Sequence, residues 1–419
     1  MARKVVGDGW KTVSTALLAG LVTASFIFAA PTPASATATS RRHHHTIAAH
    51  AAHAAAPLYK GALLEDADSG RVLYAYNADM EWPPASMAKM MLLLVASEQV
   101  AAGRVHVNDP VLVSERSAHT GGSRLGLKEG EVYPLGELMK AALVKSANDA
   151  AVAVAEKTGG SVEATVRMMN ERARSLGMLH TEYQTVDGLP PRPTHDVDRT
   201  TAYDLAAVAR AIIRETNLLL WSGQQQIEFD NGVCMLNNTN HLIGHFEGCD
   251  GLKTGFTYQA GFNVTATAKR GNMRLVAVIL GAPSNPQRFA QAAKLLEWGF
   301  DRYTALSLLR SGEPLPVQVK AESGGTIRPV AARDLKVVLP KADVSSVKVV
   351  YDIAPTIDGA VHAGEPLGRV IALDRQGALT EITAICPIDV SPAAVELGAS
   401  DAFGATAPPA EANHQQVNQ

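Results

Sequence analysis

The chain has 419 residues, of which 47% are hydrophobic and 19% are charged, a balance that is ordinary for a soluble globular protein. This length leaves room for two or more domains and a large core. The net charge of −3 excludes the basic surface that nucleic acid binding requires, and it gives no general attraction to anionic lipid.

Residues 1–38 are predicted to be a signal peptide. Basic residues near the start precede a short apolar run from residue 15 to residue 30, and small residues in an A-x-A pattern predict cleavage after Ala36 or Ala38. An uncleaved anchor is the alternative, but the apolar run is short for a membrane span. We therefore expect an exported protein of the periplasm or cell envelope.

Two low-complexity segments flank the globular part of the chain. Residues 39–57 are rich in histidine and alanine, and residues 396–419 are polar and rich in alanine and proline. Both segments are predicted to be disordered because they cannot bury enough apolar surface to fold. The tail has almost no large apolar side chains, so we expect no strong membrane anchor there.

The pattern over residues 58–305 predicts one α+β domain. In chain order we expect a β-hairpin over 61–77, a helix over 83–100, one or two helices over 134–160, helices over 161–178 and 201–215, a strand pair over 260–282 and a closing helix over 288–303. Strands at both ends with helices between them predict a helical cluster packed on an antiparallel sheet. Residues 306–395 form short alternating runs, which predict a small all-β domain.

The first candidate motif is Ser86-x-x-Lys89, at the start of the first predicted helix. Residues three apart share a helix face, so the hydroxyl and the amine would lie side by side. The run 90–96 is apolar all round, which indicates a buried helix, and burial favours the neutral form of lysine. A neutral amine beside a serine is a general base beside a nucleophile. The same spacing at Ser345 and Lys348 lies in a strand pattern, where the two side chains would face opposite ways.

Ser146-x-Asn148 and Lys253-Thr254-Gly255 are the other two candidate motifs. Serine and asparagine are poor choices inside a helix, and by themselves these two also fit an ordinary capping pair. The second motif leads into the predicted strand pair, where the lysine and the threonine could fix a carboxylate and the glycine would allow close approach. The same tripeptide also ends a predicted helix earlier in the chain, so neither motif is specific alone.

Together and in this order, the three motifs resemble those of the DD-carboxypeptidases among the low-molecular-mass penicillin-binding proteins. The resemblance covers about residues 58–389 and includes the stretches MMNERARSLGM, NNTNHLIG and GCDGLKTGFTYQAGFNVTATAKR. It implies an α+β domain of the serine β-lactamase/DD-peptidase type, followed by that family's small all-β domain. The stretch EYQTVDGLPPRP and the pair Cys234 and Cys249 depart from the family's usual text. The tail also lacks the C-terminal amphipathic helix by which many such enzymes hold the membrane.

The resemblance implies a substrate class, the peptidoglycan stem peptide that ends in D-Ala-D-Ala. Ser86 would attack the penultimate D-Ala carbonyl, form an acyl-enzyme and release the last D-Ala. Lys89 would take the serine proton, and Asn148 would hold the amide of the acyl peptide. Ser146 would relay a proton toward the leaving nitrogen, with Lys253 nearby.

The rest of the implied site surrounds the substrate's last residue. The backbone donors of the nucleophile and of Phe256 would form the oxyanion hole. The terminal carboxylate would sit on Thr254 and Arg288, beside Lys253 and Gly255. Arg288 also fits a solvated residue at the start of a helix. No metal and no organic cofactor are implied, and β-lactams such as penicillin are expected to bind covalently.

Three other functions stay open. A DD-endopeptidase would use the same acylation on cross-linked peptides. A class A β-lactamase uses the same three motifs but adds a glutamate in an E-x-x-L-N stretch, which is missing between Asn148 and Lys253. A non-catalytic module that binds wall peptide would have no need of the intact motif residues.

The cysteines suggest one covalent constraint. Cys234 and Cys249 flank the stretch MLNNTNHLIGHFEG, which could double back, and we predict a disulfide between them. In the loop-closure model, a bridge of this size stabilises the fold by about 3 kcal/mol. No C-x-x-C or Cys/His spacing indicates a zinc site.

The two S-x-x-K copies allow a direct test of the motif assignment. A fluorescent penicillin should label Ser86 and leave Ser345 unlabelled, because only the first copy is predicted to place an amine beside a hydroxyl. Peptide mapping of the labelled protein locates the adduct. A label on Ser345 would overturn the assignment.

Overall fold

The computed structural model describes residues 57–190, 197–321 and 325–390. The predicted signal peptide, the predicted linker up to residue 56 and the predicted disordered tail lie outside the described residues. Within the described ranges, no helix is long and apolar enough to cross a membrane.

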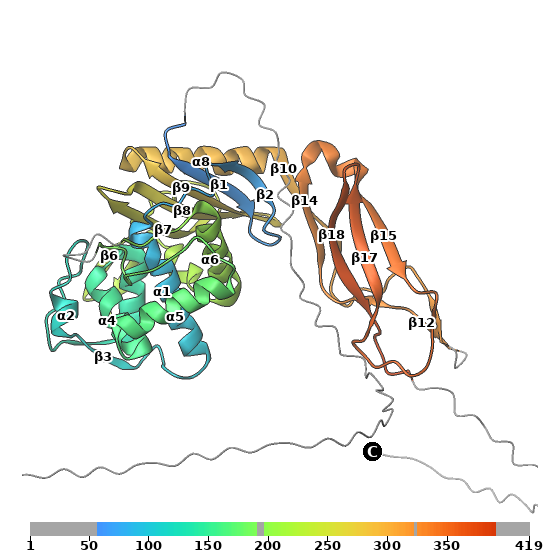
Figure 1. Cartoon of the computed structure of the whole chain (residues 1–419), viewed down its shortest axis with the longest axis horizontal. Helices are drawn as coiled ribbons and strands as arrows, with labels where there is room; N and C mark the ends of the chain where they lie inside the picture. The colour runs from blue at the N-terminus through green and yellow to red at the C-terminus, as the bar shows by residue number, and fades with distance from the viewer. Residues whose placement is uncertain (1–56, 191–196, 322–324, 391–419) are drawn as a thin grey trace, which may run out of the picture. The chain divides into compact units, whose positions relative to one another are not determined.

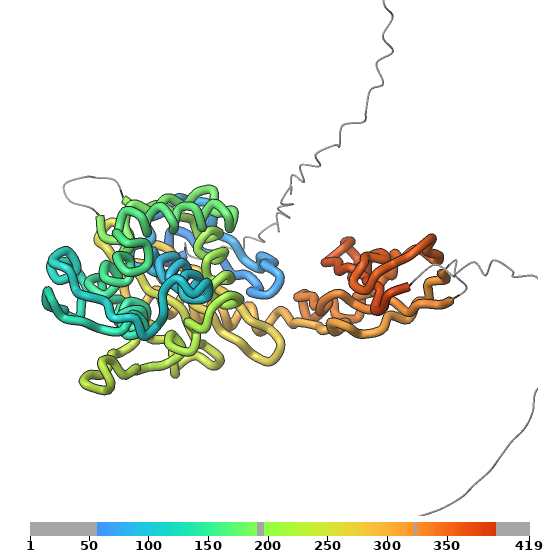
Figure 2. Tube along the Cα trace, turned by 90° about the horizontal axis from the view of Figure 1, so that it is seen from below, coloured from blue at the N-terminus to red at the C-terminus, as the bar shows by residue number. Residues whose placement is uncertain are grey.

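A five-stranded antiparallel sheet, in the order β2-β1-β9-β8-β7, forms the centre of the larger domain. Its strands are β1 (Gly61–Asp66), β2 (Val72–Tyr76), β7 (Cys249–Thr257), β8 (Gly261–Arg270) and β9 (Met273–Ala282). The predicted hairpin is confirmed as β1 and β2, and the predicted strand pair as β8 and β9. Strands β1 and β9 pair although they lie far apart in the chain (Figures 1 and 2).

Helices cover both faces of this sheet, with α8 (Asn285–Arg302) on one face and the helical cluster on the other (Figure 1). The alternation of side chains along a strand explains the two layers. On β9, Val276 and Val278 belong to the core that contains the helical cluster. Leu275 and Ala277 point the other way, into the core with α8. The α+β prediction for this domain is thus confirmed.

The helical cluster contains the following elements: η1 (Ala85–Ala88), α1 (Lys89–Ala101), α2 (Glu115–Ala118), α3 (Leu135–Lys140), η2 (Ala141–Lys145), α4 (Asn148–Gly159), α5 (Val162–Ser175), α6 (Ala202–Glu215) and α7 (Leu219–Ser222). Two short hairpins accompany it, β3 (Pro110–Leu112) with β4 (Val132–Pro134), and β5 (Gln226–Phe229) with β6 (Cys234–Asn237). Side-chain caps start the longer helices. Ser161, Thr201 and Ser284 each accept a backbone hydrogen bond at the N-terminus of α5, α6 and α8.

Two of the predicted helices are interrupted where the candidate residues lie. The first begins as the 3₁₀ turn η1, so that α1 proper starts only at Lys89. The segment 134–160, predicted as one or two helices, passes through the π-helical turn η2 and stops at Ser146, whose φ of 65° lies in the left-handed region. Helix α4 then starts again at Asn148. The second interruption places the Ser146 hydroxyl against Lys253 on β7.

The smaller domain is all-β, as predicted, and Figure 2 shows it in orange to red. Its elements are β10 (Tyr303–Leu309), β11 (Val319–Ala321), β12 (Thr326–Ile327), β13 (Val330–Ala331), β14 (Leu335–Pro340), η3 (Lys341–Ser346), β15 (Lys348–Ile353), β16 (Thr356–Ile357), β17 (Pro366–Asp374) and β18 (Gly377–Ile385). They form sheets in the orders β13-β18-β17-β15, β10-β14 and β12-β11-β16.

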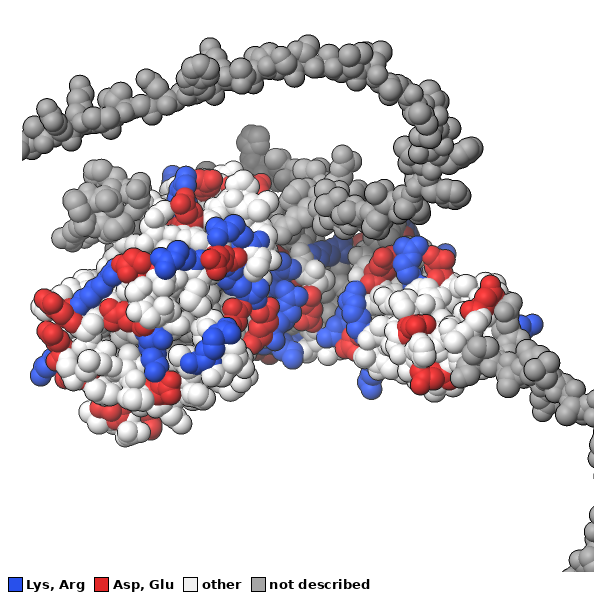
Figure 3. Space-filling view, turned by 60° about the horizontal axis from the view of Figure 1, so that its bottom comes forward, with Lys and Arg blue, Asp and Glu red and all other residues white. Residues whose placement is uncertain are grey.

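The second S-x-x-K copy is not part of a site in this domain. Ser345 lies in the 3₁₀ turn η3 rather than in a strand, and Lys348 starts β15. Both residues are exposed. Charged side chains of both signs alternate over the face of the molecule seen in Figure 3, in keeping with the small net charge.

The predicted disulfide between Cys234 and Cys249 is wrong, because both thiols are free. Cys234 is exposed on the small β5–β6 hairpin, whereas Cys249 opens strand β7 of the main sheet. The intervening segment does not bring them together because its own side chains tie it to other parts of the chain. Asn238 donates to the Ser222 carbonyl and Asn240 to the Gly251 carbonyl, each at 2.8 Å.

The free thiols should differ in reactivity. Burial raises the pKa of Cys249 to about 11, so little of it is thiolate at pH 8, whereas the Cys234 thiol is exposed. Iodoacetamide should alkylate Cys234 about a hundredfold faster than Cys249 in the folded, unreduced protein. Mass spectrometry of timed samples measures both rates, and guanidinium-unfolded protein serves as the control. Recovery of a peptide that joins the two cysteines would contradict the structure.

Candidate active site

The turn that carries Ser86 is held tightly against the main sheet. Pro83 and Pro84 precede it, and Asn263 on β8 donates to their carbonyl oxygens at 2.9 and 3.3 Å. Gly255 on β7 lies against the same turn, where a Cβ atom would be only 2.5 Å from the Pro84 carbonyl oxygen. A side chain at this position would push the strand away, which explains why the third motif ends in glycine.

Lys89 is fully buried, and its amine joins three parts of the chain. Its Nζ donates to Ser86 Oγ at 2.9 Å, to Asn148 Oδ1 at 2.6 Å and to the Asp187 carbonyl oxygen at 2.7 Å. Burial lowers the pKa of Lys89 to about 8, although nearby carboxylates, among them Asp198, act in the opposite direction. A substantial fraction of this amine is therefore neutral near pH 8, within hydrogen-bond distance of the serine hydroxyl.

The interpretation of Ser146 and Asn148 as a capping pair is wrong. Helix α4 has no side-chain cap, and Asn148 instead links Lys89 to the Gly121 carbonyl, to which its Nδ2 donates at 2.7 Å. Ser146 Oγ accepts a hydrogen bond from Lys253 Nζ at 2.8 Å. The break in the helix thus lets two side chains near each other in sequence contact two different lysines.

Lys253 lies on β7 and is also buried. Besides Ser146 it donates to the Thr254 carbonyl oxygen at 3.0 Å. Burial holds the pKa of Lys253 well below its usual range, and the positive charges of Lys89 and Arg288 lower it further. The Thr254 hydroxyl donates to Thr239 Oγ1 at 2.9 Å. The Lys253 and Thr254 side chains are thus held in place before any substrate arrives.

Arg288 supports strand β7 from helix α8. It is 7% exposed and donates to the carbonyl oxygens of Gly255 at 3.0 Å and Asn263 at 3.2 Å. Its guanidinium carbon lies 4.8 Å from the centre of the Phe289 ring. Burial lowers its pKa to about 10, and its Nε is buried without a hydrogen-bond partner among the described residues. The interpretation of this residue as a solvated helix start is therefore wrong.

Phe256 differs from its neighbours because its ring is exposed at the end of β7. Its side chain is 43% exposed and packs on Phe262, with ring centres 4.3 Å apart. Its side chain makes none of the polar contacts that join the motif residues. The resemblance assigned a role to its backbone N–H, not to its ring.

The structure thus brings the predicted residues together in two hydrogen-bonded groups. One is Ser86, Lys89 and Asn148, and the other is Ser146, Lys253 and the residue that follows it. Gly255 joins the groups because it lies against the turn that carries the nucleophile. Among the described residues, no group of three or more His, Cys, Asp or Glu side chains could hold a metal ion.

Two residues of the site act through the backbone or as supports and carry no motif in the sequence. They are Asp187, whose carbonyl accepts from Lys89, and Asn263, whose amide holds the turn before the nucleophile. The Asp-Gly pair at 187 and 188 was visible as a turn signal, but nothing in it indicates which carbonyl faces the lysine. Asn263 was hidden in a strand pattern.

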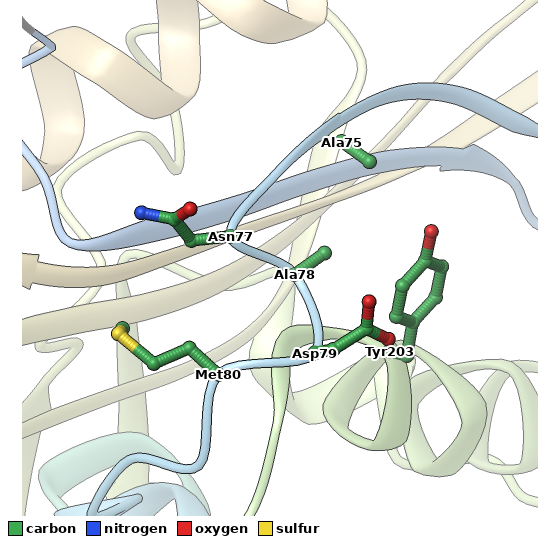
Figure 4. A pocket seen from close by; sticks show the side chains of 6 residues that line it. All are labelled: Ala75, Asn77, Ala78, Asp79, Met80 and Tyr203. Atoms are coloured by element: carbon green, nitrogen blue, oxygen red, sulfur yellow. The ribbon is translucent and has the colours of Figure 1, made fainter. Parts of the chain in front are cut away.

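A separate surface hollow does not include the candidate residues. It is lined by Ala75, Asn77, Ala78, Asp79, Met80 and Tyr203, which come from the end of β2, the segment after it and the start of α6 (Figure 4). Its polar side chains are one carboxylate, one amide and one phenol, and no nucleophile with a base is among them.

Comparison with known sequences gives a consistent result. The family described as D-alanyl-D-alanine carboxypeptidase matches residues 46–284 of the chain. The D-alanyl-D-alanine carboxypeptidase DacF of Bacillus subtilis is 33% identical over 334 residues, which cover 78% of this chain and 84% of that protein. The D-alanyl-D-alanine carboxypeptidase DacD of Escherichia coli is 32% identical over 326 residues, which cover 75% of this chain and 82% of that protein.

Solved structures are also similar. Penicillin binding protein 5 from Haemophilus influenzae has a TM-score of 0.72 and 26% identity, and the match covers 81% of this chain and 100% of that one. Penicillin-Binding Protein D2 from Listeria monocytogenes, in its ampicillin-bound form, has a TM-score of 0.54 and 28% identity over 59% of this chain and 99% of that one.

The pKa of Lys89 predicts how the reactivity of Ser86 depends on pH. Below pH 8 the amine is mostly protonated and cannot accept the serine proton, so the acylation rate should fall about tenfold for each pH unit below about 7. The second-order rate constant for labelling by a fluorescent penicillin, measured from pH 5.5 to 8, tests this.

Lys348→Met, a change in the second S-x-x-K copy, is the matched control and should leave the profile unchanged. Lys89→Met should lower the rate constant by about 10²-fold or more at pH 8. A rate constant that stays flat from pH 5.5 to 8 would be incompatible with a lysine base.

Proposed function

Since the chain belongs to the family of serine-type D-alanyl-D-alanine carboxypeptidases, we propose that it removes the terminal D-alanine from peptidoglycan stem pentapeptides through an acyl-enzyme on Ser86. One observation carries the assignment of the nucleophile. A fully buried lysine with a lowered pKa donates to the Ser86 hydroxyl at 2.9 Å. The neutral form of that amine can accept the hydroxyl proton.

Acylation begins with attack of Ser86 Oγ on the carbonyl carbon of the penultimate D-Ala. The hydroxyl proton passes to neutral Lys89 as the new C–O bond forms, and the carbonyl oxygen becomes an oxyanion. Backbone N–H groups of Ser86 and Phe256 donate to that oxyanion. The close contact of Gly255 with the turn before Ser86 favours this arrangement because it holds strand β7 next to the nucleophile.

Collapse of the tetrahedral intermediate breaks the peptide C–N bond. Ser146 donates its proton to the leaving nitrogen and takes up the proton that Lys89 received from Ser86, so that Lys89 is neutral again. Lys253, which is hydrogen-bonded to Ser146, orients the hydroxyl for this transfer. The products of this half-reaction are free D-alanine and an ester on Ser86. A water molecule, deprotonated by Lys89, then attacks the ester and restores the serine hydroxyl. Asn148 holds both Lys89 and the amide of the acyl peptide.

The substrate's terminal carboxylate binds at Thr254 and beside Lys253. Arg288 adds positive charge from behind the strand, where its guanidinium donates to the Gly255 carbonyl oxygen. Because the arginine is buried, its field is weakly screened by solvent. This set favours a substrate with a free carboxylate next to the scissile bond.

The protein acts outside the cytoplasm, where peptidoglycan lies. We further propose that residues 1–38 direct export and that the mature enzyme, which begins after Ala36 or Ala38, works in the periplasm or cell envelope. β-Lactams are expected to acylate Ser86 and remain bound. One relative, Penicillin-Binding Protein D2 from Listeria monocytogenes, is solved in ampicillin-bound and cefotaxime-bound forms, which supports this part of the proposal.

Product analysis tests the proposed activity directly. The purified protein should release one D-alanine from a stem pentapeptide and act more slowly on a cross-linked dimer, as measured by mass spectrometry of the products. Ser86→Ala should abolish release, and Lys253→Ala should lower kcat/KM by about 10²-fold. Ser345→Ala is the control and should match the unchanged enzyme.

Two other results would assign a different function. Faster cleavage of the dimer than of the pentapeptide would identify an endopeptidase. Rapid turnover of penicillin without an accumulated adduct would identify a β-lactamase.

A further inference from the structure

Asp198 is a buried carboxylate outside the three motifs, and it is 4% exposed. It accepts hydrogen bonds from the backbone N–H of Gln184 at 2.6 Å and of Thr185 at 2.9 Å. The Thr185 hydroxyl donates to the second carboxylate oxygen at 2.7 Å. Three donors from two consecutive residues thus fix the start of the segment that leads to Asp187.

The Thr185 hydroxyl links Asp198 to Gly188, which lies next to the nucleophile. While it donates to Asp198, its oxygen accepts a hydrogen bond from the backbone N–H of Gly188 at 2.9 Å. Gly188 has a φ of 81° and lies directly on the peptide between Ala85 and Ser86. A Cβ atom there would be 1.9 Å from the Ala85 carbonyl oxygen and 2.8 Å from the Ser86 nitrogen, so the two backbones are in contact.

The residues that follow Asp198 hold the other side of the same turn. Arg199 exchanges two backbone hydrogen bonds with Glu182, each at 2.9 Å. Thr200 exchanges two with Trp82, at 2.7 and 3.1 Å, just before the turn that carries the nucleophile. One short segment therefore anchors both the chain that enters the turn and the segment that contacts Lys89.

We propose that Asp198 is a positioning residue for acylation, which acts through the Thr185 hydroxyl to hold the Asp187 carbonyl and Gly188 against Lys89 and Ser86. The inference rests on the proposed roles of Ser86 and Lys89. Asp198 itself touches neither the hydroxyl nor the amine.

The physical reason is that Lys89 has a flexible four-carbon chain and needs fixed acceptors to point at Ser86. Two of its three acceptors are side chains, and the third is the Asp187 carbonyl. If the segment at 184–188 relaxes, that carbonyl moves and the amine follows it or loses a bond. A displacement of about 1 Å at a reacting group can lower a rate by about 10²-fold.

Four single variants test the proposal through the rate of acylation by a fluorescent penicillin, expressed per titrated active site. Thr185→Val removes only the relaying hydroxyl and should slow acylation by about 10- to 100-fold, as should Asp198→Asn. Thr185→Ser keeps the hydroxyl and should stay within about twofold of the unchanged enzyme. The double variant Thr185→Val/Asp198→Asn should be acylated no more slowly than the slower of the two single variants. Both changes break the same hydrogen-bonded relay, so their effects should not add.

Thr165→Val is the matched control. Thr165 is a buried threonine on α5, and its hydroxyl donates to the Ala155 carbonyl oxygen at 2.7 Å, on α4 rather than on the segment at 184–188. It should lower the melting temperature without changing the rate per active site by more than about twofold. A general loss of stability and a loss of positioning are therefore separated by the same assay.

If penicillin acylates the Thr185→Val variant as fast as the unchanged enzyme, the inference is wrong. This result tests the inference even if Asp198→Asn does not fold. Failure of the unchanged enzyme to be labelled at Ser86 would instead refute the proposed function, so the two failures are distinguishable.

Discussion

The burial of the Lys89 amine is the constraint on which the rest of the site depends. An ammonium group taken out of water is strongly disfavoured unless it is paired, and here its three acceptors are a hydroxyl, an amide oxygen and a backbone carbonyl. None of them carries a full negative charge, so the amine loses its proton more readily than a solvated lysine does. Burial also lowers the pKa of the nearby Lys253, and the positive charges of its neighbours lower it further. A base and a proton relay can therefore coexist near neutral pH.

To exclude water from Lys89 and Lys253, backbone segments around them must lie closer together than side chains at the contact points would allow. Gly255 lets strand β7 contact the turn before the nucleophile, and Gly188 lets a second segment contact that turn from another side. The left-handed conformation at Ser146 ends one helix so that its hydroxyl faces Lys253. Because packed interiors leave little room for adjustment, each of these approaches fixes a distance in the site.

The sequence was sufficient to predict the motif residues, the all-β second domain and most strands and helices. Residues three apart near a helix start meet by local geometry, so Ser86 and Lys89 could be paired without a structure. A break near Ser146 was an open alternative, because serine and asparagine are poor choices inside a helix, but its left-handed conformation and its contact with Lys253 depend on long-range packing that the sequence does not reveal. The Asp187 carbonyl has no side-chain signature at all. The disulfide prediction failed because proximity in sequence does not reveal that Cys234 and Cys249 lie on two different sheets.

A lysine titration observed by nuclear magnetic resonance tests the central claim most directly. With ¹³C at the ε-carbon of every lysine, the ordinary lysine pKa of about 10.4 is the reference for the titration. Two signals should titrate well below this range, and the one that disappears in Lys89→Met should have a midpoint near pH 8. If every lysine signal, including the one lost in Lys89→Met, titrates near pH 10.4, the buried amine is an ordinary ammonium and the account of catalysis built on it is contradicted.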